Sequence, residues 1–189
     1  MLNKELRILL FSSLIWFFGE GMLGPLFAVF AGKIGGDILD ISIAWSLYLI
    51  AMGIMMIIIG KLSDTKINKK KLMLTGYTLN AALTFCYLLV DNPLQLLIVQ
   101  VGLGIATALA TPTWDALYSR YAQKHNCKSL GTCWGLSDGL EEIVTGIAII
   151  LGGLVVVYIS FTTLFVIMGI IQTIAVIALI PLLKKRDIF

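Results

Sequence analysis

The segment GKLSDTKINKKKL, residues 60–72, is a short charged turn between two long apolar segments. Asp64 follows Gly60 by four positions, and a run of three lysines begins at Lys69. Cytoplasmic loops of membrane proteins are rich in lysine, which explains the lysines but not the spacing from Gly60 to Asp64. We therefore expect the turn itself to have a role in function.

The flanking segments continue through the whole chain, which is 59% apolar with a mean hydropathy of +0.96. An apolar fraction of roughly half is usual in soluble domains, so the composition indicates an integral membrane protein. A membrane-spanning helix needs about 20 mostly apolar residues. Six segments meet this requirement: 8–30, 41–62, 72–90, 93–118, 132–158 and 161–183. The sequence predicts an all-α membrane protein with residues 1–189 in a single six-helix transmembrane domain.

The charges predict one orientation in the membrane. If the N-terminus is cytoplasmic, every Lys and Arg except Lys33 falls on the cytoplasmic side. Lys and Arg in short loops set orientation, so we expect both termini to face the cytoplasm, in the cell (inner) membrane. The net charge of +3 then reflects topology and predicts no nucleic-acid partner.

The sequence gives no sign of an enzyme. The connections between the six segments are too short to hold a catalytic domain, and no nucleophile and base stand at workable spacing. His125, Cys127 and Cys133 match no common zinc spacing and lack a fourth ligand. We expect no metal, no cofactor and no enzymatic activity.

The first segment combines a predicted bend with an acidic residue. Gly19, Gly21, Gly24 and Pro25 favour a kink or the close approach of another helix. Glu20 lies about 18 Å into the segment at 1.5 Å per residue, near the middle of the membrane.

Glu20 shares a helical face with two aromatic residues, Trp16 and Phe27, which suits a substrate pocket. Acids inside membranes usually mark proton or substrate paths. The alternative is a structural carboxyl that is protonated or bonded to helix backbone.

The fourth segment carries a polar stripe. Steps of four, three, four and four residues place its members within an arc of about 80°. The stripe consists of Gln100, Gly104, Thr107, Thr111 and Asp115. A carboxylate in hydrocarbon costs about 2.5–3.5 kcal/mol, so this face should line a cavity or a helix contact. Alternatively, Asp115 snorkels to the cytoplasmic end or pairs with Arg120.

Three acids stand near the start of the fifth segment: Asp138, Glu141 and Glu142. The helix dipole stabilises one of them by about 0.3–1 kcal/mol, which does not account for all three. Glu142 is the deepest and is the better functional candidate. We expect structural roles for Asn80 and Trp45.

The turn resembles the signature loop between the second and third helices of the major facilitator superfamily, a class of secondary transporters. The matching positions are Gly60, Leu62, Asp64, Lys69 and Lys70. Thr65 replaces a usual basic residue. Gln100 stands four residues before Gly104, where the family often has an arginine, and Gly-spaced residues 131–153 resemble its fifth helix.

The resemblance implies one half of a twelve-helix fold, with six helices in a three-plus-three arrangement. In that fold helices one and four surround the cavity, helices two and five meet the other half, and helices three and six lie outside. A second half could come from a parallel homodimer, which a single fixed orientation allows.

The implied function is proton-coupled secondary transport by alternating access, with protons, a small-molecule substrate and the lipid bilayer as partners. An acidic and aromatic lining disfavours anions and suits a neutral polar solute, such as a sugar, or an organic cation. The alternatives are a non-transporting membrane module, a half that pairs with a different protein, and the N-terminal fragment of a longer transporter.

Site residues follow from the same layout. The proton-coupling candidates are Glu20, Asp115 and Glu142. The gating loop comprises Gly60, Asp64, Lys69 and Lys70. The substrate-binding candidates are Trp16, Glu20, Phe27, Gln100, Thr107, Thr111, Trp114 and Asp115.

Overall fold

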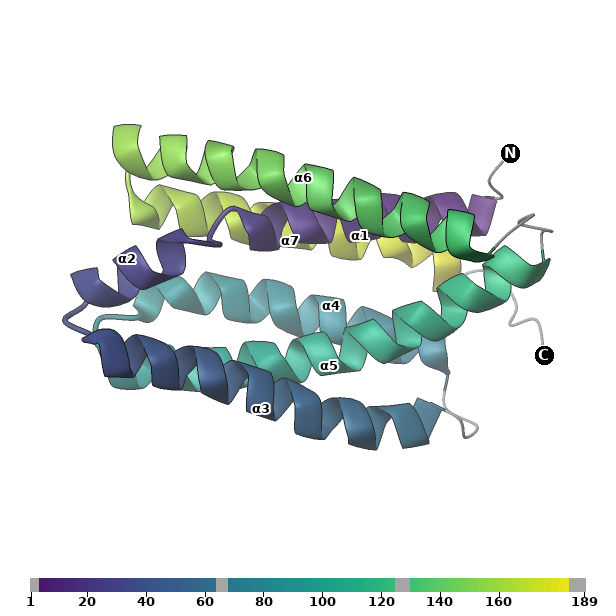
Figure 1. Ribbon diagram of the computed structural model, residues 1–189, viewed down its shortest axis with the longest axis horizontal. Coiled ribbons are helices and arrows are strands. Elements are labelled where there is room, and N and C mark those ends of the chain that lie inside the picture. Colours follow the sequence, from purple (N-terminus) through teal and green to yellow (C-terminus); the bar gives the residue numbers. More distant parts are fainter. Residues whose placement is uncertain (1–3, 64–67, 125–129, 184–189) are drawn as a thin grey trace.

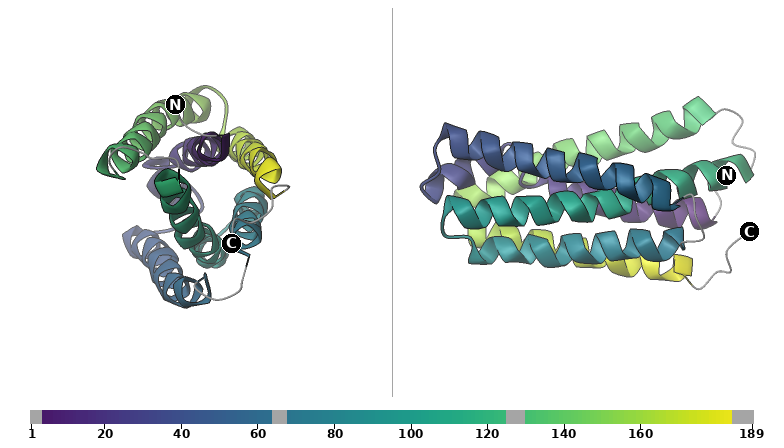
Figure 2. Two further views of the ribbon diagram at one scale, coloured as in Figure 1. Left: turned by 90° about the vertical axis from the view of Figure 1, so that its right-hand side faces the viewer. Right: turned by 90° about the horizontal axis from the view of Figure 1, so that it is seen from below.

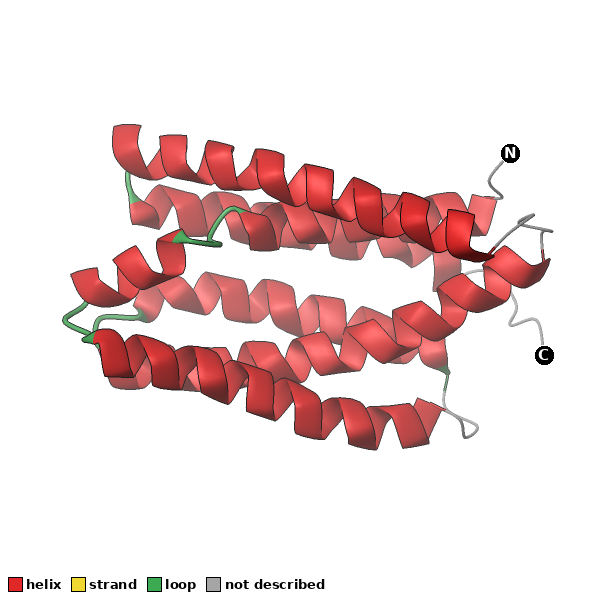
Figure 3. Ribbon diagram, in the orientation of Figure 1, coloured by secondary structure: helices red, strands yellow, loops and turns green. Residues whose placement is uncertain are grey.

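The computed structural model describes residues 4–63, 68–124 and 130–183, and the regular secondary structure in this part of the chain is all helical (Figures 1 and 3). The elements are α1 (Lys4–Gly21), α2 (Leu26–Lys33), α3 (Ile38–Ser63), α4 (Lys69–Cys86), the short 3₁₀ helix η1 (Tyr87–Leu89), α5 (Pro93–Lys124), α6 (Leu130–Tyr158) and α7 (Phe161–Leu183).

The all-α fold with six spans is confirmed. Five of the described helices are long and apolar enough to cross a membrane, and α1 with α2 makes a sixth span bent by 44°. Several predicted bounds are too short; the fourth span, for example, runs on to Lys124 instead of ending at residue 118.

The bend in the first span lies where the sequence predicted it. A continuous helix would need the nitrogen of Pro25 to donate to the carbonyl of Gly21, but proline has no N–H. Its ring would also collide with that carbonyl, so α1 ends at Gly21 and α2 begins after Pro25. The bend places Glu20 in the last turn of α1, beside an interruption of the backbone.

The helices form two interlocked groups of three. In one group α3 and α4 both pack on α5, and in the other group α6 and α7 both pack on α1. The helices α4 and α7 also pack on each other. Seen end-on in Figure 2, α3 and α6 lie at two edges and α4 and α7 lie together on one side. Each group therefore combines two spans from one half of the sequence with one span from the other half, which is the three-plus-three arrangement. The repeat in the sequence itself is weak.

Glycines allow the close helix crossings. A Cβ at Gly104 of α5 would collide with the carbonyl oxygen of Tyr48 in α3. A Cβ at Gly152 of α6 would likewise collide with the carbonyl oxygen of Met22. Small residues let membrane helices approach closely. In this chain one glycine allows the contact of α5 with α3, and another allows the contact of α6 with the first span.

A matched pair of substitutions tests the second crossing. Gly152→Ala is expected to lower the melting temperature in detergent, because the new methyl group forces α6 away from the first span. Gly153→Ala changes the neighbouring residue, where a Cβ meets no atom within 4 Å, and should leave the melting temperature unchanged or raise it. Equal effects of both substitutions would contradict the crossing.

Side-chain caps start several of the described helices. Asp37 and Asp40 each accept a hydrogen bond from the other's backbone N–H, at 2.9 and 3.0 Å, where α3 begins. Asn68 accepts from the backbone N–H of Lys71 at 3.1 Å and begins α4. Such caps satisfy amides that have no partner within the helix.

The signature turn is described only in part. Gly60 lies in the last turn of α3, and Lys69 and Lys70 lie in the first turn of α4, where Lys70 is buried. Asp64 lies outside the described residues, so the predicted gating contact is not tested.

Several helix ends lie together at one end of the bundle. The helices α1 and α4 begin there, and α3 and α7 end there (Figure 1). Lys33 ends α2, which lies toward the opposite end.

Candidate functional site

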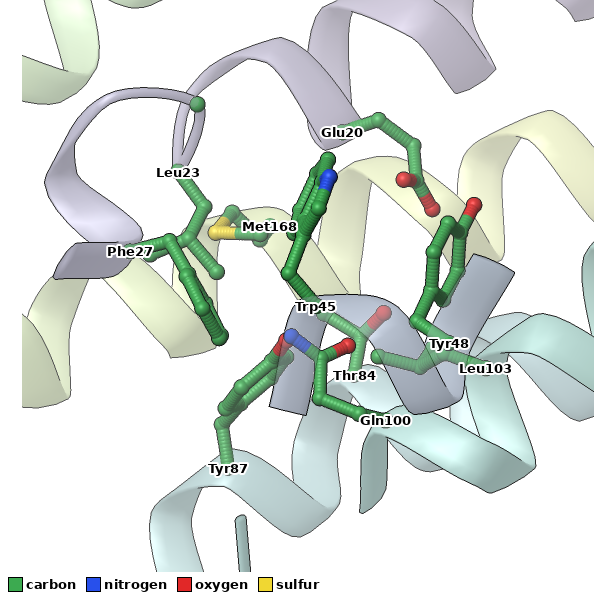
Figure 4. Close-up of a pocket in the computed structure, with 11 residues that line it drawn as sticks. Glu20, Leu23, Phe27, Trp45, Tyr48, Thr84, Tyr87, Gln100, Leu103 and Met168 are labelled. Carbon is green, nitrogen blue, oxygen red and sulfur yellow. The ribbon is translucent and has the colours of Figure 1, made fainter. Parts of the chain in front are cut away.

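A cavity of about 80 Å³ lies beside the bend of the first span, and we name it the Glu20 cavity (Figure 4). Its walls come from α1, α2, α3, α4, α5 and α7, with additional residues from the bend and from η1. The lining residues are Glu20, Leu23, Gly24, Phe27, Trp45, Tyr48, Thr84, Tyr87, Gln100, Leu103 and Met168.

Glu20 is held by an amide on α4. The Asn80 side-chain nitrogen donates to the Glu20 Oε1 at 2.8 Å. Asn80 is fully buried, and its own oxygen accepts a longer contact of 3.4 Å from the Thr84 hydroxyl. A hydrogen bond to a carboxyl in a water-poor site fixes the position of that carboxyl. Asn80 therefore orients Glu20 toward the cavity.

Aromatic rings form one wall of the Glu20 cavity. The rings of Trp45 and Tyr48 stack with centroids 5.5 Å apart, and Phe27 lies 5.6 Å from Trp45. The Tyr48 hydroxyl lies on the same side of the cavity as the Glu20 carboxyl (Figure 4). It also makes a weak contact of 3.4 Å with the Thr107 hydroxyl. Flat apolar faces beside a carboxyl and an amide suit a polar organic ligand.

A second hollow, of about 160 Å³, lies nearer the end where α1 begins, and we name it the acidic groove. It continues into a neighbouring hollow of about 330 Å³ that shares Phe17, Asp138 and Glu141 and adds Glu142 and Thr145. The acidic groove is lined by Ser13, Trp16, Phe17, Tyr77, Ala110, Thr111, Trp114, Asp115, Trp134, Asp138 and Glu141.

Stacked aromatic rings support the acidic groove. Trp114 lies on Tyr118 with centroids 4.8 Å apart and planes 8° from parallel, and Trp134 packs edge-on against both rings. The Tyr118 hydroxyl donates to the backbone carbonyl of Cys133 at 2.6 Å. This cluster ties α5 to α6 and fixes the wall that carries the carboxylates.

Comparison with known proteins identifies the family. The profile of the Major Facilitator Superfamily matches residues 9–188. The chain belongs to the Major Facilitator Superfamily. It is 26% identical to an uncharacterized MFS-type transporter of Methanocaldococcus jannaschii, over 99% of this chain and 47% of that protein. The chain therefore spans about half the length of the curated relative that it matches.

Membership of this superfamily makes the chain an integral membrane protein of a transporter family. It agrees with the predicted half of a major-facilitator fold, because six spans in two interlocked groups of three are present.

In this superfamily member the predicted site residues divide between two hollows. Glu20, Phe27 and Gln100 line the Glu20 cavity. Four others line the acidic groove: Trp16, Thr111, Trp114 and Asp115. Thr107 lines neither hollow and contacts the Tyr48 hydroxyl instead. Sequence reasoning had put Trp16 on the Glu20 face. The structure separates them because Trp16 lies one turn nearer the start of α1, in the other hollow.

The polar stripe of α5 is turned toward the two hollows and is buried or half-buried along its length. At one end Gln100 is 2% exposed in the Glu20 cavity, and further along Thr107 meets Tyr48. At the other end Thr111 and Asp115 line the acidic groove.

Among the acids of α6, Asp138 and Glu141 share the acidic groove with Asp115, whereas Glu142 lines the neighbouring hollow only. Sequence reasoning preferred Glu142 for its depth. Depth alone does not decide which acid lines the groove, because the direction of the side chain around the helix also counts.

The structure adds residues that sequence reasoning treated as structural or left out, namely Asn80, Trp45, Tyr48 and Trp134. The signal for Asn80 was its position as an amide deep in an apolar span. Among the described residues, no three His, Cys, Asp or Glu side chains are placed so that they could hold one metal ion.

Proposed function

We propose that this protein is a half-size secondary active transporter that works by alternating access as a parallel homodimer, with its 189 residues as one six-helix domain. The single observation that carries the proposal is Glu20. It lies at a helix break in the membrane, bonded to the buried Asn80 and facing a cavity with aromatic walls. Such intramembrane acids mark substrate and proton paths.

Proton coupling is assigned first to Glu20 and then to Asp115 and Glu142. In the Glu20 cavity a carboxyl that exchanges a proton changes the charge beside the substrate, which couples proton movement to binding. Gln100 supplies a hydrogen-bonding amide there in place of the arginine that the resemblance would lead one to expect.

The proposed substrate is a neutral polar solute, such as a sugar, or an organic cation. Phe27, Trp45 and Tyr48 offer ring faces, while Glu20 and Gln100 offer hydrogen-bonding groups. No Lys or Arg is among the described residues that line the Glu20 cavity, which disfavours an anion.

The dimer is supported by polar groups on α6. Asp138 and Glu142 are exposed in the isolated chain, although both lie within a membrane-spanning helix. Carboxylates do not face lipid tails, so water or another protein surface must cover them. A second copy in the same orientation would place α3 and α6 at the contact and enclose a shared vestibule. The one-sided charge pattern supports this, with both termini in the cytoplasm and the cell (inner) membrane as the location.

In this arrangement the gating loop, with Gly60, Asp64, Lys69 and Lys70, is proposed to bind the partner copy in one state and release it in the other. Asp64 would interact with free amides at the start of the partner's fifth span.

A second candidate is favoured by one observation, the relative of about twice the length. The chain could pair with a different half, serve as a non-transporting module, or form the N-terminal part of a longer transporter. Light scattering of the purified protein measures its oligomeric state. A monomer whose mass rises only when a different protein is added would favour pairing with a different half.

Uptake into proteoliposomes tests the function. Glu20→Gln keeps the shape and the hydrogen bond to Asn80 but cannot ionise, so uptake should no longer respond to an imposed pH gradient while substrate binding remains. Asp91→Asn, on an acid between α4 and α5, is the matched control and should keep the response. A Glu20→Gln protein that still follows the gradient would refute the coupling role.

A further inference from the structure

The acidic groove gathers three carboxylates from two helices, Asp115 of α5 with Asp138 and Glu141 of α6. The charges of these groups act on one another, which is unfavourable when all are ionised. No Lys or Arg is among the described residues that line the groove. A positive charge in this groove would offset the repulsion between the carboxylates.

Aromatic rings line the same groove. Trp16 and Tyr77 meet with ring centroids 4.1 Å apart on one side, and Trp114 and Trp134 meet edge-on at 6.0 Å on the other. An organic cation over the face of a tryptophan or tyrosine is attracted by the ring quadrupole, and more strongly where water is scarce. Carboxylates beside several ring faces favour an organic ammonium over a simple metal ion.

A buried indole in the groove lacks a partner. Trp114 lines the groove with 7% of its surface exposed, and its Nε1 makes no hydrogen bond. Buried indole N–H groups normally find an acceptor, and leaving one unpaired is unfavourable. A ligand with an acceptor oxygen would give this N–H a hydrogen-bond partner. A cation without an oxygen would leave it unpaired.

The groove has room for a small organic ligand. Its volume is about 160 Å³, and it adjoins the neighbouring hollow of about 330 Å³. The groove also lies nearer than the Glu20 cavity to the end of the bundle where α1 begins, because Trp16 precedes Glu20 along that helix.

We propose that the acidic groove binds a small organic cation that carries an acceptor oxygen, such as an amino alcohol with a quaternary ammonium group. The ammonium lies among Asp115, Asp138 and Glu141 against the tryptophan faces. The oxygen accepts from the Trp114 indole, whose N–H is shielded in this structure and turns to meet the ligand. The proposal rests on the proposed transport function and narrows its substrate class to cations. The groove then binds the cation near the cytoplasmic side of the membrane, as the distribution of Lys and Arg assigns the two sides.

Calorimetric titration of the purified protein tests the groove with three probes. Choline carries both features, tetramethylammonium lacks the oxygen, and 3,3-dimethylbutan-1-ol is the uncharged isostere of choline. Choline should bind most tightly, and the uncharged alcohol should bind about tenfold more weakly or not at all. Equal binding of the alcohol and choline, or no saturable binding of choline, would overturn the proposal.

Three variants locate the probe. Asp138→Asn should weaken choline binding by about tenfold, since it removes one charge at constant shape. Trp114→Phe should weaken choline binding more than tetramethylammonium binding, because it removes the N–H in addition to part of the ring face, and only choline uses the N–H. Asp91→Asn serves as the control and should bind choline like the unchanged protein. Unchanged choline affinity in both groove variants contradicts the assignment.

Uptake measurements separate this proposal from the transport function on which it rests. If choline binds but no vesicle accumulates it or any other solute, the transport function fails and the groove stands. If a neutral solute is transported while choline does not bind, the groove proposal fails and the transport function stands.

Discussion

Replacing Asn80 by Leu is expected to destabilise the fold by about 1–3 kcal/mol and to reduce uptake about tenfold or more. The leucine keeps nearly the same volume but removes the amide that donates to Glu20 at 2.8 Å. Glu20 then lies inside the membrane without its partner, and a polar group that loses its partner keeps its full desolvation penalty. Thermal unfolding in detergent and uptake into proteoliposomes measure the two effects.

A double variant is the control for this prediction. Glu20→Met combined with Asn80→Leu removes both partners of the hydrogen bond, so most of the lost stability should return while uptake stays low. This pattern separates a functional pair from a general packing defect. A stable and fully active Asn80→Leu protein would contradict the role assigned to the bond.

Two copies joined in one polypeptide are expected to transport as well as the separate chains. The first helix begins and α7 ends at the same end of the bundle, so a flexible linker need not cross the membrane. The joined chain must place its copies in the same orientation, as the proposed dimer requires. Uptake per copy should equal that of the unlinked protein.

Loss of all uptake in the linked protein, with folding intact by gel filtration, would speak against the parallel arrangement. A linker of doubled length is the matched control, because it removes strain without changing the orientation of the copies.

The spans and the bend could be predicted because each rests on local chemistry. A run of about 20 apolar residues has few alternatives to a membrane helix, and Pro25 cannot donate to Gly21 in any context. The common direction of the polar stripe on α5 also followed from helical spacing. The ends of the helices were less predictable, since charged residues such as Lys4 and Lys124 extend helices beyond the apolar run.

The partners of Glu20 could not be predicted. Membrane helices are apolar on all sides, so hydropathy does not tell which face of α4 or α3 turns inward. Asn80 and Trp45 were therefore expected to be structural, although Asn80 binds Glu20 and Trp45 lines the cavity beside it.

The division of the site residues between two hollows could not be predicted from the sequence either. Helical spacing gives the direction of a side chain around the axis, and a shared direction placed Trp16 with Glu20. Whether two residues on one face meet the same hollow depends on what the neighbouring helices insert between them, and this emerges only from packing.

The central claim is that two copies share one vestibule lined by Glu20. The most direct measurement is uptake by the linked protein with Glu20→Gln in only one of its two copies. The shared vestibule predicts that proton-driven uptake falls far below half, to about a tenth or less, because each transport cycle uses both copies. If half of the uptake remains, each copy works alone and the claim is wrong.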